Sequence, residues 1–514
     1  MRLLLRTTTS LLAAPITGSP GGAQLHRGRS TRAAHRLSRE HVDSILRASE
    51  YSYTVPEFDG KNVSVVMGFE SNQLPSNSPI EDRRAAATCL QSGGMLLGVF
   101  DGHAGPACAQ ALSERLFYYV AMALLPTATL RHIEDAVEAR RSVPPVLLWH
   151  KHPYDYVNRE SAALYFQSLR TYWQELIDLD DGTQPDVADA LAGAFARLDS
   201  DLSLEAQAGT PSRCLTALAL RSAFSGATAC VALVCDGELH VANVGDSRAV
   251  LGRRAGAGWE AVPLSRDHCA ENPAEVARLH AEHPESERRT VLRHGRLLGA
   301  LAPLRAFGDV KFKWSQELQR RVLESGADLV EGIGHRDFFP QDYHSPPYLN
   351  ARPEVSRHRL GPGDRFLVLA TDGLWEMLDM DDVVRTVGDY LEATEGGAVA
   401  QRHQQERREG GSVVRLGEMH GRLLLQQRQR QRATPGGGTT TTTTTSPDTS
   451  PSADRNAATA LVRRAVGRDE SGRVCEERVA EMLGLPEELA RMYRDDITVT
   501  VVVFNPSVLD GEHR

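Results

Sequence analysis

The chain has 514 residues and a formal net charge of −9, with 41% hydrophobic and 24% charged residues. These fractions are ordinary for a globular protein with a large core, and they exclude a collagen-like or wholly disordered chain. No run of 18 or more apolar residues occurs, which argues against a membrane-spanning helix. The seven cysteines are spread widely without a C-x-x-C pair, which argues against a disulfide framework or structural zinc site. The sequence therefore predicts a soluble intracellular protein.

The first 39 residues differ in composition from the rest of the chain. They contain seven arginines and no acidic residue, and they are rich in Ser, Thr and Ala. Such a start is typical of a mitochondrial transit peptide, and a disordered basic arm is the alternative. Subtracting those seven positive charges from −9 leaves −16 for the remainder, and so acidic a body is a poor binder of nucleic acid. We therefore predict a transit peptide over residues 1–39 and no nucleic-acid partner.

The next segments alternate between strand-like and helix-like patterns. An apolar run over 95–100 predicts a buried strand, residues 109–125 have the spacing of an amphipathic helix, and 137–208 are mostly helical in pattern. Further strands are predicted over 227–234, 239–244, 248–252, 366–370 and 497–504. Asp236 and Gly237 separate two of these runs and predict a hairpin turn.

Residues 396–455 have a composition that does not suit a packed core. They include a stretch of only Gln and Arg over 426–432 and seven consecutive threonines over 439–445. Such a segment cannot bury enough apolar surface to offset the entropy of ordering. Because a strong strand pattern returns at 497, we predict a disordered surface insertion within a domain spanning 45–505.

Acidic residues stand at the ends of several predicted strands. Asp101, Asp246 and Asp372 each follow an apolar run, whereas Asp495 precedes one. Taken singly, each is most simply a turn residue, since Asp-Gly and Gly-Asp-Ser are common in turns. Taken together, they predict carboxylates converging at one rim of a sheet, where a divalent cation would relieve their repulsion. Oxygen ligands suit Mg²⁺ or Mn²⁺ better than Zn²⁺.

An ordered set of motifs extends this pattern along the chain. The motifs are Glu81-Asp82, Asp101-Gly-His103, Ser225-Gly-Ala-Thr228, Gly245-Asp246-Ser-Arg248, Arg305-Ala-Phe-Gly-Asp309, Asp372-Gly-Leu-Trp375 and Arg494-Asp495-Asp496. In this order they resemble the metal-dependent serine/threonine protein phosphatases of the PPM (type two C) family. The resemblance covers roughly residues 45–505. It implies an α+β fold, a four-layer α-β-β-α sandwich of two antiparallel sheets flanked by helices, with a two-metal site at one edge.

The resemblance also implies a role for each acidic residue at that site. Asp101 would bridge two Mg²⁺ or Mn²⁺ ions, and the Gly102 carbonyl would bind one of them. Asp372 and Asp495 would each hold one ion, and Asp246 with Asp372 would hold a looser third. Glu81 and Asp82 would act mainly through metal-bound waters.

The implied chemistry is attack on phosphorus by a metal-activated water, which needs no Cys or Ser nucleophile. His103 resembles the family's general acid for the leaving serine or threonine oxygen, and a histidine can donate a proton near neutral pH. One position departs from the family, which usually has an arginine that grips the phosphate shortly before the Glu-Asp pair. Asn77 is the nearest candidate here, and an uncharged amide binds phosphate more weakly than a guanidinium.

Several stretches between the motifs resemble one group in that family, the mitochondrial pyruvate dehydrogenase phosphatases. They are residues 58–62, 71–75, 149–153, 171–176, 307–314 and 485–496. This resemblance implies the mitochondrial matrix, phosphoserines of the pyruvate dehydrogenase α subunit as substrate, and docking on the lipoyl domain of the acetyltransferase core. It also implies a regulatory subunit and, in one isoform, Ca²⁺; because the sequence has no EF-hand loop, any Ca²⁺ would be shared at a partner interface.

Two alternatives remain open at this point. The metal motifs would serve equally well in a mitochondrial phosphatase for another phosphoprotein, such as branched-chain keto acid dehydrogenase. A catalytically inactive scaffold is the other alternative. It predicts the loss of a metal-binding carboxylate, whereas Asp101, Asp372 and Asp495 are all present.

Overall fold

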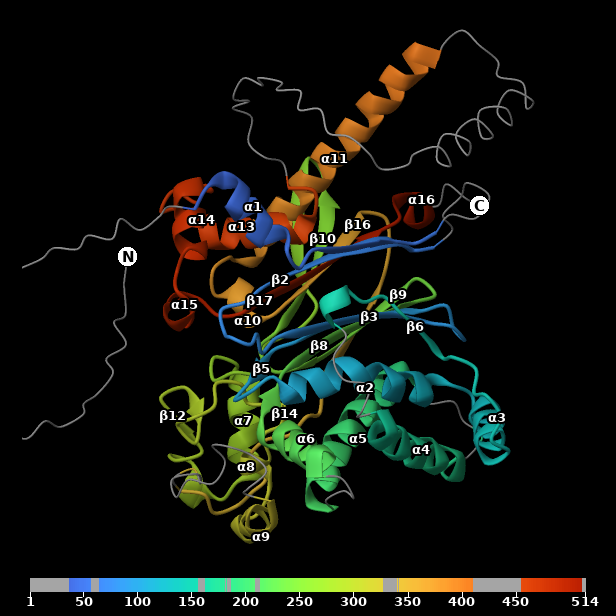
Figure 1. Ribbon diagram of the computed structural model, residues 1–514, viewed down its shortest axis with the longest axis vertical. Coiled ribbons are helices and arrows are strands. Elements are labelled where there is room, and N and C mark those ends of the chain that lie inside the picture. The colour runs from blue at the N-terminus through green and yellow to red at the C-terminus, as the bar shows by residue number, and fades with distance from the viewer. Residues whose placement is uncertain are drawn as a thin grey trace, which may run out of the picture. The chain divides into compact units, whose positions relative to one another are not determined.

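The computed structural model describes residues 37–56, 64–155, 162–180, 182, 186–208, 213–326, 340, 342–409 and 454–510. Within these residues, two six-stranded antiparallel sheets pack face to face, and helices cover the outer side of each (Figure 1). The predicted α-β-β-α sandwich is therefore confirmed. The predicted transit peptide lies outside the described residues up to position 36, so it stays a prediction.

The first sheet combines strands from both ends of the chain with strands from its middle. In spatial order its strands are β1 (Tyr51–Thr54), β2 (Val66–Leu74), β17 (Ile497–Phe504), β16 (Asp364–Ala370), β10 (Arg248–Ala255) and β11 (Gly258–Pro263). Helices α1 (Arg39–Arg47), α11 (Met380–Glu409), α13 (Ala457–Gly467) and α14 (Glu476–Leu483) lie on its outer side (Figure 1). The short helices α10 (Asp372–Trp375), α15 (Glu487–Tyr493) and α16 (Pro506–Leu509) flank its strands.

The second sheet comes from the middle of the chain. In spatial order its strands are β15 (Glu354–Arg359), β9 (Glu238–Val244), β8 (Ala229–Cys235), β4 (Met95–Phe100), β3 (Arg83–Cys89) and β6 (Leu147–Trp149). Its outer side carries α2 (Ala107–Leu124), α3 (Thr127–Glu138), α4 (Ala162–Asp178), α5 (Val187–Ala208) and α6 (Arg213–Phe224). Asp236 and Gly237 both have positive φ in the β8–β9 turn, which confirms the predicted hairpin.

Two smaller sheets connect these layers to a helical subregion. The three-stranded sheet has the order β14 (Phe307–Gly308), β7 (Gly226–Ala227) and β5 (Gly102–His103), so it joins three segments far apart in the sequence. The subregion contains α7 (Pro273–Glu282), α8 (Val310–Lys313), α9 (Gln316–Gly326), the 3₁₀ turn η3 (Glu285–Glu287) and the hairpin of β12 (Leu292–Arg293) with β13 (Arg296–Leu297). A further 3₁₀ turn, η1 (Pro153–Asp155), follows β6.

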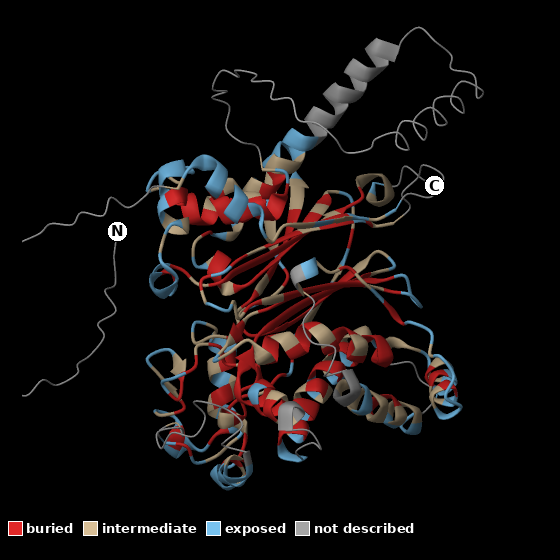
Figure 2. Cartoon of the chain, viewed as in Figure 1, coloured by how far each residue is buried: buried red, intermediate tan, exposed pale blue. Residues whose placement is uncertain are grey.

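Strand β4 shows why the central strands are almost continuously apolar. All six of its residues are buried, because one face meets the other sheet and the opposite face meets the helices (Figure 2). Leu97 and Val99 join the core between the sheets, whereas Leu96 and Phe100 pack in the core shared with α2. The alternation follows from side chains pointing to opposite faces along a strand.

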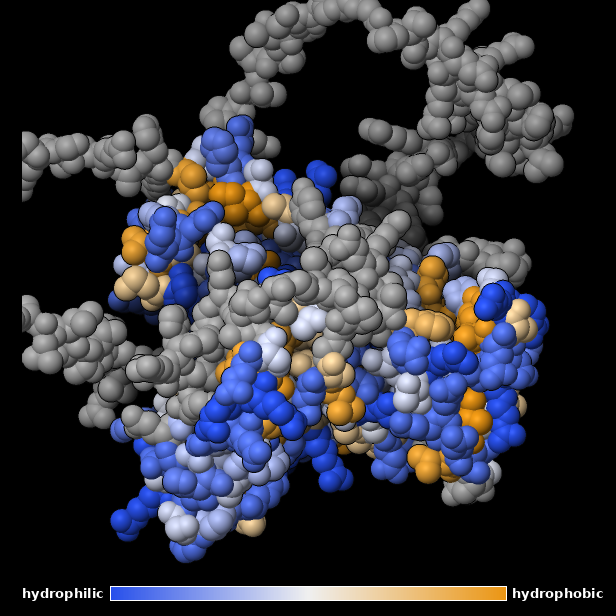
Figure 3. Space-filling view, turned by 60° about the horizontal axis from the view of Figure 1, so that its bottom comes forward, coloured by the Kyte–Doolittle hydropathy of each residue, from blue (hydrophilic) through white to orange (hydrophobic). Residues whose placement is uncertain are grey.

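The predicted insertion at 396–455 begins inside a helix, because α11 continues to Glu409. Residues 410–453 lie outside the described part, so the insertion stays a prediction. In the described part of the chain, no helix is both long and apolar enough to span a membrane. On the face shown in Figure 3, hydrophobic side chains form separate patches among hydrophilic ones.

Candidate metal centre

Three predicted acidic residues meet at one edge of the sandwich. Asp101 follows β4, Asp246 follows β9, and Asp372 begins α10 directly after β16. One carboxylate oxygen from each of the three lies within 4.8 Å of the others. The cluster therefore takes ligands from both sheets, and it can form only when the sheets are packed together.

The electrostatics of this cluster suit a bound cation. Burial and the negative charges of neighbouring carboxylates, Asp372 among them, hold the pKa of Asp101 well above its usual range. The pKa of Asp372 is raised in the same way by burial and by Asp246 and Asp495, and burial raises the pKa of Asp246 to about 6. The Oδ1 atom of Asp372 is buried without a hydrogen-bond partner. A divalent cation would supply both the missing ligand contact and the missing positive charge.

Glu81 and Asp82 are hydrogen-bonded to segments that adjoin this cluster. The Glu81 carboxylate accepts a hydrogen bond from the Gly105 backbone N–H at 2.6 Å. The hydroxyl of Thr371, the neighbour of Asp372, donates to the Asp82 carboxylate at 2.8 Å. Burial and the negative charge of Asp496 raise the pKa of Asp82 to about 8. These two residues are thus anchored to the segments that present two of the three clustered aspartates, Asp101 and Asp372.

Asp495 and Asp496 have different partners. Asp495 forms an ion pair with Arg491, although burial still raises the pKa of its carboxyl. Asp496 accepts hydrogen bonds from the backbone N–H groups of Ser76, Asn77 and Glu81, and from the Asn77 side-chain amide at 3.0 Å. Asp496 therefore organises the loop that leads to Glu81. Asn77, the candidate phosphate ligand, already gives one side-chain hydrogen bond to this carboxylate.

The glycines after two of the aspartates are required by close packing. A Cβ atom on Gly102 would lie 2.4 Å from the Glu81 carbonyl oxygen, and one on Gly373 would lie 2.0 Å from that of Asp496. Both distances are too short for any side chain. The Asp-Gly pairs are therefore more than turn dipeptides, because each glycine lets a backbone segment bearing another acidic residue approach the site.

His103 has a partner to which the sequence analysis assigned no role. Its Nε2 lies 2.5 Å from Oδ2 of Asp309, whose side chain is fully buried. Burial lowers the pKa of His103, but the charge and hydrogen bond of Asp309 outweigh it and the net shift is upward. A Cβ on Gly226 would lie 2.1 Å from that Nε2, so β7 leaves the space that the pair occupies. The one sequence signal that could have pointed to Asp309 was its membership of the ordered set of motifs.

The backbone around Asp309 explains how the two side chains meet. Strand β7 pairs with β5, which carries His103, and with β14, which ends at Gly308. Gly308 and Asp309 have φ values of +64° and +49°, in the left-handed region that a residue other than glycine rarely adopts. The Asp309 backbone N–H donates to the Ser225 carbonyl at 2.9 Å, which holds this turn in place.

Comparison with known proteins gives the family of the chain. Residues 154–413 match the family described as protein phosphatase 2C. The human protein named mitochondrial [pyruvate dehydrogenase [acetyl-transferring]]-phosphatase 1 is 57% identical over 93% of this chain and 85% of its own length. The chain belongs to the protein phosphatase 2C family.

Other members are more distant from this chain. The human protein named mitochondrial [pyruvate dehydrogenase [acetyl-transferring]]-phosphatase 2 is 48% identical over 93% of this chain and 85% of its own. Among solved structures, serine-threonine phosphatase 2C from Toxoplasma gondii is 17% identical, covers 89% of this chain and 99% of its own, and gives a TM-score of 0.38. Protein phosphatase 2C enzymes depend on metal ions, and the acidic cluster at 101, 246 and 372 fits that dependence.

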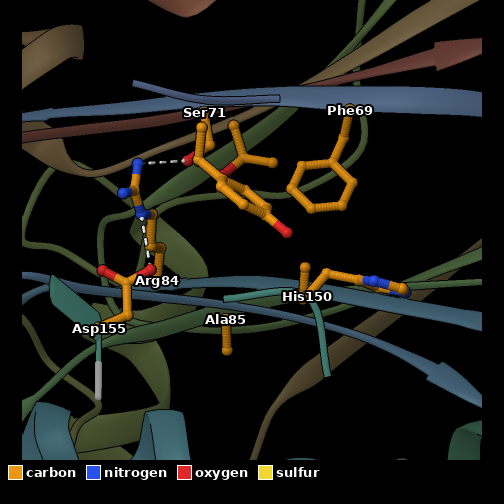
Figure 4. A pocket seen from close by; sticks show the side chains of 9 residues that line it. Phe69, Ser71, Arg84, Ala85, His150 and Asp155 are labelled. Carbon is orange, nitrogen blue, oxygen red and sulfur yellow. Dashed lines mark hydrogen bonds and ion pairs between the residues drawn. The ribbon is translucent and has the colours of Figure 1, made fainter. Parts of the chain in front are cut away.

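A cavity between the sheets is lined by residues other than the clustered aspartates. It is lined by Tyr51, Phe69, Ser71, Arg84, Ala85, Ala86, His150, Asp155 and Thr500 (Figure 4). Its one arginine, Arg84, donates to Asp155 at 3.2 Å and to the Ser71 hydroxyl at 3.1 Å. The cavity therefore contains none of the clustered aspartates that lie at the sheet edge.

Proposed function

We propose that this chain is a mitochondrial, metal-dependent protein serine/threonine phosphatase that removes phosphate from serines of the pyruvate dehydrogenase α subunit. The observation that carries the proposal is the convergence of Asp101, Asp246 and Asp372, with a buried carboxylate oxygen of Asp372 lacking a partner. The substrate follows from the names of the relatives at 57% and 48% identity. An inactive scaffold would have no need to bring three mutually repelling carboxylates together.

The proposed ligands are the three clustered aspartates together with the Gly102 carbonyl and Asp495, which the family resemblance implies. Asp101, the Gly102 carbonyl, Asp372 and Asp495 would hold two Mg²⁺ or Mn²⁺ ions, and Asp246 with Asp372 would hold a third. Glu81 and Asp82 would orient waters around the ions. When bound, the ions lower the pKa of a water and neutralise phosphoryl charge. Asp101 is central because four neighbouring carboxylates raise the pKa of its own carboxyl group. They belong to Asp372, Asp82, Asp246 and Asp495.

His103 would donate the proton that the leaving serine oxygen needs as its bond to phosphorus breaks. Asp309 accepts from Nε2 of the ring, so it fixes the orientation of the imidazole, and the other ring nitrogen would serve the substrate. Asn77 would contact the phosphate with the part of its amide that Asp496 does not use. This grip is weak because an amide carries no charge.

Weak binding of free phosphopeptides would be offset by recruitment, which raises the local concentration of substrate. We propose that recruitment uses the lipoyl domain of the acetyltransferase core and a regulatory subunit in the mitochondrial matrix, with Ca²⁺ at a partner interface. The support for these partners is the resemblance to pyruvate dehydrogenase phosphatases over stretches such as 149–153 and 485–496.

Phosphate release from phosphorylated pyruvate dehydrogenase tests the proposal directly. We expect release with Mg²⁺, none with EDTA, none with Asp101→Asn, and faster release when the lipoyl domain is added. Metal-dependent hydrolysis of a generic phosphoserine peptide without release from pyruvate dehydrogenase would retain the enzyme class and reject the substrate. In that case, branched-chain keto acid dehydrogenase is the next substrate to test. Inactivity on every substrate would favour the scaffold.

A further inference from the structure

A fully buried histidine is bonded to the residue that precedes one of the clustered aspartates. His268 lies in the connection between β11 and α7, and Gly245 stands directly before Asp246 at the end of β9. Nδ1 of His268 accepts a hydrogen bond from the Gly245 backbone N–H at 3.0 Å. The backbone N–H of His268 donates to the Gly245 carbonyl at 2.9 Å. His268 therefore binds both backbone polar groups of Gly245.

The backbone at Gly245 needs such support because it has left the sheet. Strand β9 ends at Val244, so Gly245 lies outside the pairing with the neighbouring strands. Its φ is +101°, and a Cβ atom at this position would lie 2.5 Å from Cβ of Thr228, so only glycine fits. The side-chain amide of Asn243 also donates to the Gly245 carbonyl, at 3.1 Å. Buried side-chain and backbone groups thus fix the peptide from which the next residue projects.

Only one ring nitrogen of His268 contributes a hydrogen bond. Because Nδ1 accepts the Gly245 N–H, the proton of the neutral ring is on Nε2. Among the described residues, this buried Nε2 has no hydrogen-bond partner, and the Glu354 carboxylate lies 3.6 Å from it. A buried N–H without a partner costs free energy, so an apolar side chain would be cheaper to pack here. The histidine is therefore explained by the acceptor that it provides at Nδ1.

We propose that His268 is a positioning residue of the metal centre, which acts through Gly245 to hold the carboxylate of Asp246 in place for a cation. This inference rests on the proposed function and adds a residue to it. One oxygen of Asp246 lies within 4.8 Å of oxygens from Asp101 and Asp372. Three carboxylates so close together repel one another when no cation is bound, so the backbone has to hold Asp246 against that repulsion. Residues that orient a metal ligand from behind commonly set the affinity of the site.

Two substitutions of His268 separate the acceptor at Nδ1 from the bulk of the side chain. His268→Asn keeps an acceptor near the position of Nδ1, whereas His268→Gln places its amide nearer to Nε2. His283→Gln is the matched control, because His283 is also buried, has Nδ1 2.9 Å from the Ser345 hydroxyl and has an unpartnered Nε2. Binding of Mn²⁺ to each full-length variant is measured by calorimetric titration, and folding by thermal unfolding without metal.

The expected result is a selective loss of metal affinity. Asp246 is proposed to hold the loosest ion, so His268→Gln should weaken the weakest Mn²⁺ site about tenfold and leave the tighter sites within about threefold of wild type. His268→Asn should restore the weakest site to within about threefold of wild type. The control should bind Mn²⁺ as the wild type does.

Each contrary result has a distinct meaning. Wild-type Mn²⁺ affinity in a folded His268→Gln variant overturns the positioning role, even if its unfolding temperature falls, because His268 would then support the fold alone. Equal weakening by Asn and Gln also overturns it, since the acceptor at Nδ1 would not be what matters. A wild-type chain that binds no Mn²⁺ would fail the proposed function itself. If the Gln variant does not fold, His268→Ala provides the same comparison with Asn, because it removes the acceptor without adding a buried amide.

Discussion

Replacing Asp309 with asparagine tests whether Asp309 positions His103 as the proton donor. The substitution should slow only the reaction that needs this proton. Asn keeps the shape of the side chain and removes its negative charge. The carboxylate of Asp309 is fully buried, holds His103 at 2.5 Å through Oδ2, and has no hydrogen-bond partner at Oδ1. The nearest cation is Lys311, whose Nζ lies 3.9 Å from that Oδ1. The charge-assisted bond to His103 is therefore the main interaction that the substitution weakens.

The size of the effect follows from the kind of hydrogen bond that is lost. A hydrogen bond to a charged group contributes about 1.5–3 kcal/mol, which corresponds to about 10-fold to 150-fold in rate if the bond orients the acid in the transition state. This loss should appear with a phosphoserine peptide, whose alkoxide leaving group needs a proton. It should be small with p-nitrophenyl phosphate, whose leaving group is stable as an anion. Metal-dependent kcat on the two substrates measures the difference.

Asp199→Asn is the matched control for this experiment. Asp199 accepts from the Gly308 backbone N–H at 2.9 Å and from Lys313 at 2.7 Å, so it supports the same turn without touching His103. We expect it to lower the unfolding temperature without changing the ratio of the two rates. Equal losses on both substrates for Asp309→Asn, or no loss on either, would refute the assignment of Asp309 as the residue that positions the acid.

Three further predictions concern stability. Asp101→Asn should raise the unfolding temperature of the metal-free protein, because one of the clustered, mutually repelling carboxylates is removed, and should abolish the further rise on adding Mg²⁺; a Mg²⁺ response that survives would contradict the ligand assignment. His268 accepts a hydrogen bond from the Gly245 N–H, and burial lowers its pKa to about 4. The unfolded chain then binds the proton first, so stability should fall by about 2 kcal/mol between pH 7.5 and 5 in urea unfolding, and His268→Asn should flatten this slope; an equal slope in the variant would refute it. Arg115→Met leaves the buried carboxylate of Glu205 without its cation and should cost about 3–5 kcal/mol; a loss below about 1 kcal/mol would show that water reaches Glu205.

Local patterns were enough to identify the strands that carry the site. The apolar runs over 95–100, 366–370 and 497–504 became β4, β16 and β17, because a strand buried on both faces has few polar positions. The hairpin turn at Asp236 and Gly237 could also be predicted from the sequence, since the positive φ values of such a turn favour those residue types. The order of the acidic motifs indicated the metal chemistry and the family before any contact between them was known.

The sequence by itself determined which residues could bind metal and in which strands they stand, because those properties depend on residue type and on neighbours within a few positions. Only the tertiary structure decided which of them touch. It placed His103 in contact with Asp309, which lies 206 residues later in the chain, and it paired the Asn77 amide with the Asp496 carboxylate. It also showed that the packing at Gly102 and Gly373 leaves no room for a side chain. It also left Met492 and Tyr493 exposed to solvent. Such contacts arise when two sheets close on each other, and no spacing along the chain encodes the distance between segments that meet only in the folded protein.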